Sequence, residues 1–139
     1  MGSFSDYLES KILDHVLGAA TFVPPSTVYF ALYTVTPDDA GGGVEVSGGG
    51  YARVAVPNNG TNFPPATGDT PTLKANGTSV MFPASGAATS SWGTVVAMAV
   101  YDAATGGNEL CWAALAIAKT IDVGDTATFG VGAFTLTLD

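Results

Sequence analysis

The chain has 139 residues, of which 47 % are hydrophobic and only 12 % charged, and its formal net charge is −8. This length predicts one domain that folds without disulfides or a structural metal. The four basic residues are scattered, which excludes nucleic-acid binding, since that needs clustered cations, and disfavours anionic membrane surfaces. Soluble domains usually carry about twice this charged fraction. We therefore expect part of the surface to be covered by other protein, either further copies of the chain or a different partner. The alternative is a monomer whose surface is rich in Thr and Gly.

The first predicted element is the only helix. Its apolar residues recur at helical spacing: Phe4, Tyr7, Leu8, Ile12, Leu13, Val16 and Leu17. Asp6 and Glu9 suit a helix N-terminus, and Gly18 is a natural stop. A helix this short is marginal alone, so its apolar face must pack on its own sheet or on a neighbouring subunit. We divide the chain into an N-terminal amphipathic helix, residues 1–18, and a single β domain, residues 19–139.

The remainder alternates between β-type runs and loops rich in Gly and Pro. The expected strands are 27–35, 44–46, 51–56, 79–82, 94–101, 109–118, 120–123, 126–131 and 134–138. Runs 94–101 and 109–118 form one predicted hairpin, and runs 120–123 and 126–131 form another. The fold prediction is all-β: a two-sheet antiparallel β-sandwich, jelly-roll-like, with one short N-terminal helix.

The sequence contains few residues that carry chemistry. One histidine, His15, and one cysteine, Cys111, are too few for a zinc site, and no Gly-x-Ser-x-Gly elbow supports a catalytic triad. We interpret Asp38, Asp39 and Glu45 of the Gly-rich loop as turn residues and leave calcium open. We expect no catalytic residue, no cofactor and no metal.

Two weaker hypotheses concern sugars. Glu45 and Glu109 are conceivable as the carboxylate pair of a glycosidase, although nothing in the sequence selects them. Trp92, between Ser91 and Gly93 at a strand entrance, is the candidate for glycan stacking. Burial in the core is the ordinary role of such a tryptophan, so both interpretations of Trp92 stay open.

The N-terminal residues lack a signal-peptide pattern, and no apolar stretch is long enough to span a bilayer. Cys111 lies in a predicted strand and is interpreted as a small buried hydrophobe. These features predict synthesis in a reducing cytoplasm and no membrane partner.

Several stretches together resemble a family of small tailed-phage virion proteins commonly labelled tail fibre proteins. Similar β-sandwich proteins serve as capsid decoration, or cement, proteins. The resemblance covers nearly the whole chain in order, through residues 6–18, 28–34, 36–43, 45–53, 91–94, 101–108 and 132–139.

The resemblance implies a structural component of a bacteriophage virion, made in the host cytoplasm, and not an enzyme. The first hypothesis is a capsid decoration (cement) protein, expected as a homotrimer, that binds the major capsid protein or another virion protein and stabilises the assembled head. The candidate partner-binding residues are Tyr7, Leu8, Ile12 and Leu13 of the helix, and Asp38, Asp39 and Glu45 of the loop. The alternative is a tail-fibre or receptor-binding domain that recognises host surface glycans, with Trp92 as its stacking residue. A small glycan hydrolase is the third hypothesis.

Overall fold

The computed structural model of the chain describes residues 2–138. The elements in chain order are β1 (Gly2–Phe4), α1 (Asp6–Leu17), β2 (Thr27–Val35), β3 (Val44–Glu45), β4 (Val54–Pro57), β5 (Thr72–Ala75), β6 (Val80–Phe82), β7 (Gly93–Tyr101), β8 (Glu109–Ile121), β9 (Ala127–Phe129) and β10 (Thr135–Leu138).

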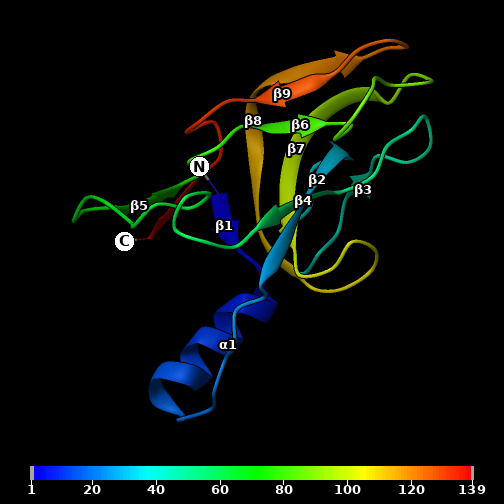
Figure 1. Cartoon of the computed structure of the whole chain (residues 1–139). Coiled ribbons are helices and arrows are strands. Elements are labelled where there is room, and N and C mark those ends of the chain that lie inside the picture. Colours follow the sequence, from blue (N-terminus) through cyan, green and yellow to red (C-terminus); the bar gives the residue numbers. More distant parts are fainter. Residues whose placement is uncertain (1, 139) are drawn as a thin grey trace.

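The main sheet is antiparallel and has six strands, in the order β1-β8-β7-β2-β3, with β4 also paired to β2. Strand β2 is central because β7 pairs along one edge, while β4 and β3 share the other. Its sequence of β-branched and aromatic residues suits a strand paired on both edges, and residues 30–33 are fully buried. The long β7–β8 hairpin carries the sheet outward to β1 (Figure 1).

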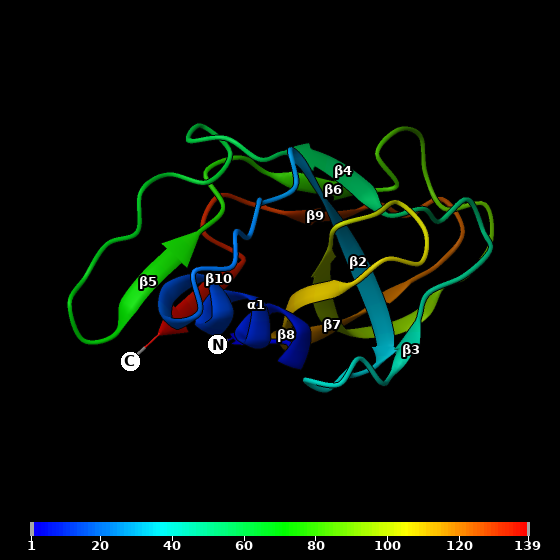
Figure 2. The same cartoon turned by 90° about the horizontal axis from the view of Figure 1, so that it is seen from below.

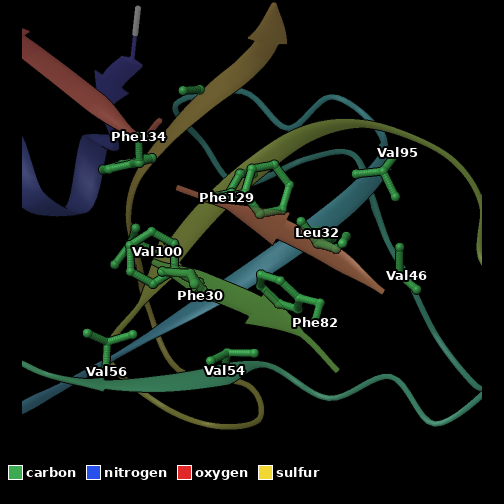
Figure 3. Packing of buried hydrophobic residues seen from close by; sticks show 14 of the residues in the cluster. Phe30, Leu32, Val46, Val54, Val56, Phe82, Val95, Val100, Phe129 and Phe134 are labelled. Atoms are coloured by element: carbon green, nitrogen blue, oxygen red, sulfur yellow. The ribbon is translucent and has the colours of Figure 1, made fainter. Parts of the chain in front are cut away.

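The second layer consists of two separate two-stranded sheets, β6–β9 and β5–β10. Their apolar side chains pack on one face of the main sheet, as expected for a sandwich. Phe30 lies at the centre of this core and is fully buried, with its ring edge-on to Phe134 at 5.3 Å. Phe82 and Phe129 close the other end, edge-on at 6.1 Å (Figure 3).

The opposite face of the main sheet has a smaller core. It is built around three alanines and two tyrosines: Ala31, Ala97, Ala99, Tyr33 and Tyr101. The small alanine side chains leave room for the Tyr33 and Tyr101 rings, whose hydroxyls hydrogen-bond to each other. The β2–β3 and β7–β8 loops are tied to this face by the side chains described below.

The predicted β-sandwich with one N-terminal helix is confirmed, and the structure adds two strands that the sequence did not predict. Residues 2–4 form β1, and residues 72–75, expected as loop, form β5. The predicted hairpin of 120–123 with 126–131 is wrong. Thr120 and Ile121 end strand β8, where they pair with β7, so β9 crosses to the second layer and pairs with β6.

Candidate functional site

Helix α1 projects from one end of the sandwich (Figures 1 and 2). Ser5 caps its start, because the Ser5 Oγ accepts the Leu8 N–H at 3.2 Å. Asp6 and Glu9 lie in the first turn, where carboxylates interact favourably with the helix dipole. Gly18 ends the helix as predicted, with its N–H donating to Asp14 O at 2.9 Å.

The chain returns to the sheet along the side of α1. Ala19 adopts a left-handed conformation, with φ of 55°, which reverses the chain direction. The Ala20 N–H then donates to Asp14 O, and the Phe22 N–H donates to His15 Nδ1 at 3.3 Å. His15 therefore holds the return segment on the helix, which is a structural role.

The base of α1 is built into the sandwich. Tyr7 and Leu8 are half-buried and pack against the main core. The Ser5 N–H donates to Leu110 O, and the Asp6 N–H donates to Asp39 O at 2.8 Å. Together with β1, these contacts make residues 2–8 part of the β body, so the free part of the helix begins after Leu8.

The far end of α1 carries exposed apolar side chains. Leu13 is 61 % exposed, Val16 67 %, Leu17 84 % and Val23, on the return segment, 75 %. We call these four residues the apolar tip. Residues 16–26 include no charged residue, and exposed apolar clusters of this kind mark interaction surfaces. Of the predicted helix residues, Leu13 belongs to the tip, Ile12 is half-buried, and Tyr7 and Leu8 belong to the base.

The three predicted loop carboxylates do not form one surface. Asp38 Oδ1 accepts the N–H groups of Ala40 and Gly42, as expected of a turn residue. Asp39 Oδ1 accepts the Trp112 Nε1–H at 2.9 Å, beside the base of α1. Glu45 lies elsewhere, in an ion pair with Arg53.

Arg53 clamps two loops onto the small core. Its guanidinium donates to both oxygens of Glu45, at 2.9 and 2.8 Å, and to the carbonyls of Ala103 and Gly106. It also lies 3.6 Å from the centroid of the Tyr101 ring. The clamp fixes the relative position of the β2–β3 and β7–β8 loops. Sequence analysis did not single out Arg53, since its partners are distant in the chain.

Glu109 is a buried carboxyl without a cationic contact. It is 6 % exposed, and its Oε2 accepts the Tyr101 hydroxyl at 3.0 Å. Its Oε1 is buried and accepts no hydrogen bond in the described chain. The pKa of Glu109 is raised to about 7, chiefly by burial; the Tyr101 hydrogen bond and the charge of Arg53 oppose the rise, and the charges of Asp38 and Asp39 add to it.

Glu109 lines a pocket of about 390 Å³ at the base of α1. Asp6 and Asp39 line it too, and no Lys, Arg or His does. We call it the acidic pocket. Among residues 2–138, no group of three or more His, Cys, Asp or Glu is placed to hold a metal ion. Glu45 lines a different pocket, so the hypothetical glycosidase pair of Glu45 and Glu109 is not brought together.

Trp92 is a core residue. It is 5 % exposed, its Nε1–H donates to Gly49 O at 2.9 Å, and its ring lies edge-on to Tyr51 at 5.5 Å. The indole offers no free face to a sugar, so the structure does not support the glycan-stacking candidate.

Cys111 is buried as expected, and desolvation raises the pKa of its thiol to about 12. No helix within the described chain is long and apolar enough to cross a membrane.

The comparisons with known proteins identify a family. The family described as podophage GP4 fiber I protein gp80 matches residues 3–137, nearly the whole chain. No curated protein matches. The family match agrees with the resemblance to phage virion proteins, and among the alternatives it favours the fibre. The chain belongs to the Gp80 family of podophage fiber proteins and is a structural component of a bacteriophage virion.

Proposed function

We propose that the protein is a non-enzymatic component of the tail fibres, held on the virion by the apolar tip of α1. The family match over residues 3–137 is the observation that carries the fibre assignment. It supports the tail-fibre hypothesis and not the specific role of capsid cement. Host glycan recognition has no exposed aromatic candidate at Trp92, so attachment within the virion is the part that the geometry supports best.

The exposure of the tip supports its role as the anchor. Leu17 is 84 % exposed, so its side chain contributes little to the stability of the isolated fold. Burying such a side chain in a partner is worth roughly 1.5–3 kcal/mol. The geometry fits the mode in which a helix inserts into an apolar groove of another protein.

The charges along α1 indicate the chemistry of the partner surface. Asp6, Glu9 and Asp14 lie on α1 without an ion pair, since the one ion pair of the described chain joins Arg53 and Glu45. The nitrogen of Lys11, the one lysine of the helix, lies over the Tyr7 ring at 5.6 Å. We therefore propose a partner groove with an apolar floor and a basic rim, on another virion protein. The predicted homotrimer is a further proposal, which native mass spectrometry tests.

Substitutions at the tip test the anchor more sharply than a deletion of residues 1–17, which also removes β1 and the base of the helix. Val16→Lys and Leu17→Lys place a charge where an apolar contact is required. We expect virions assembled with either variant to lack the protein, as measured by quantitative immunoblotting of purified particles.

Val131→Lys is the matched control. Val131 is 71 % exposed, close to the value for Val16, and lies in the loop between β9 and β10. We expect this variant to be incorporated normally. Normal incorporation of Val16→Lys and Leu17→Lys would show that the tip is not the anchor.

A further inference from the structure

We infer that the acidic pocket at the base of α1 receives an arginine side chain of the protein that binds the apolar tip. The inference rests on the proposed function, because it describes a second contact with the same partner. Three observations lead to it: the charge of the pocket, the unsatisfied oxygen of Glu109, and the position of the pocket beside the anchor helix.

The pocket concentrates negative charge without a counter-charge. Asp6, Asp39 and Glu109 line it. Arg53, whose charge acts on Glu109, already binds Glu45 and two loop carbonyls. The nitrogen of Lys11 lies 5.6 Å from the ring centroid of Tyr7, on the helix, and Lys11 is not among the residues that line the pocket. Carboxylates gathered in this way repel one another, and a cation entering the pocket relieves that repulsion.

Glu109 supplies an acceptor that no protein group uses. Its Oε2 binds the Tyr101 hydroxyl, whereas Oε1 is buried and unpaired among residues 2–138. A buried acceptor left without a donor costs roughly 1–3 kcal/mol. Glu109 is one of the residues that line the pocket, so a donor that enters the pocket approaches this carboxyl group.

The ligand chemistry follows from the two carboxyl groups, Asp39 and Glu109, that line the same pocket. Asp39 Oδ1 accepts the Trp112 Nε1–H, and its Oδ2 accepts no hydrogen bond among residues 2–138. A guanidinium presents several N–H groups in a planar fork and binds carboxylates more effectively than a point-like ammonium does. The volume of about 390 Å³ is more than ten times the roughly 30 Å³ that a water molecule occupies, so an arginine head group has room. No metal-binding cluster competes for the site in the described chain.

The position links the pocket to the anchor. Ser5, Asp6 and Tyr7, at the start of α1, form one wall. Gly107 and Asn108 of the β7–β8 loop also line the pocket. The tip lies at the other end of this 12-residue helix, which is roughly 18 Å long, so a protein that grips the tip and extends along α1 reaches the pocket.

The test uses the full chain and N-acetyl-L-arginine amide as the probe, followed by NMR of the backbone amides. We expect saturating shifts at Gly41, Gly107 and Glu109, and binding about tenfold tighter at pH 8 than at pH 6. The pH effect follows because a carboxyl group with a pKa of about 7 is roughly 10 % ionised at pH 6 and roughly 90 % ionised at pH 8. The groups that face Glu109 and set this dependence are Asp6, Tyr33, Asp38, Asp39, Arg53, Tyr101 and Cys111.

Glu109→Gln removes the ionisable group with little change of shape, and we expect it to abolish the pH dependence and weaken binding at pH 8 at least tenfold. Asp39→Asn keeps an acceptor for Trp112 and is expected to weaken binding severalfold. Asp69→Asn removes the same charge from an exposed loop position outside the pocket and should bind like the wild type.

The proposal is overturned if the probe produces no saturating shifts. Equal shifts with the neutral analogue N-acetyl-L-citrulline amide, or shifts at these amides with calcium chloride but not with the arginine probe, also overturn it. The tip variants are judged by incorporation into particles, so loss of incorporation without arginine binding would leave the proposed function standing and reject only this inference.

Discussion

The pH dependence of stability should report the buried Glu109 carboxyl directly. Its pKa in the folded chain is about 7, against an ordinary value of 4.5. Below pH 4.5 the group is protonated in both the folded and the unfolded states, and burial of its charge costs nothing. As the pH rises from 4.5 through 7, the unfolded chain ionises first, and the free energy of unfolding falls. The shift corresponds to a loss of about 3 kcal/mol, complete above pH 7.

Urea unfolding at several pH values between 5 and 8.5 measures this loss. Other carboxylates also respond to pH, so the comparison that isolates Glu109 is the wild type against Glu109→Gln. We expect the variant to lack the Glu109 component of the slope and to be more stable than the wild type at pH 8, with a melting temperature higher by about 10 °C. Glu9→Gln, which removes an exposed charge from helix α1, should keep the wild-type slope. A Glu109→Gln profile parallel to that of the wild type would refute the reasoning.

Three further predictions concern the packing of the sandwich. Arg53→Ala leaves Glu45 without its cation and two loop carbonyls without donors, and should cost about 3 kcal/mol in urea unfolding; a loss below about 1 kcal/mol would contradict the clamp. Phe30→Ala removes a fully buried ring and should cost about 3–5 kcal/mol, so a near-neutral calorimetric result would contradict its central place in the core. The Cys111 thiol, buried and with a pKa of about 12, should react with a thiol-specific disulfide reagent only after unfolding; rapid reaction in the native protein would disprove its burial.

Local sequence patterns predict the elements that depend on local signals. Helix α1 is predicted by apolar residues at every fourth position and by the carboxylates of its first turn, and Gly18 marks its end. The run TVYFALYTV places β2 at its observed bounds. In both cases the residue pattern and the Gly or Pro residues at its ends define the element, so it can be predicted without knowledge of the tertiary packing.

The missed strands are short and depend on distant partners. Strand β1 is the tripeptide Gly2–Phe4, which pairs with residues 111–113 of β8. Strand β5 lies in a stretch rich in Pro, Thr and Gly and forms against β10. Neither run carries a recognisable period of its own, since long-range pairing supplies its stability.

The candidate site was predictable in part, for a similar reason. Helical spacing predicts that Leu13, Val16 and Leu17 share the apolar side of α1, but of the four tip residues the sequence singles out only Leu13 as a partner contact. Which part of this side the sandwich covers depends on the fold. The acidic pocket could not be predicted from the sequence, because Asp6, Asp39 and Glu109 come from three distant segments. A single glutamate at the start of a strand gives no local sign of burial.

A cryo-EM reconstruction of the whole virion, with this chain located in the map, tests the central claim most directly. We predict that the chain lies in the tail fibres, with the apolar tip of α1 enclosed by another virion protein. Density for the chain on the outer surface of the head, or in the fibre with the tip facing solvent, would contradict the account.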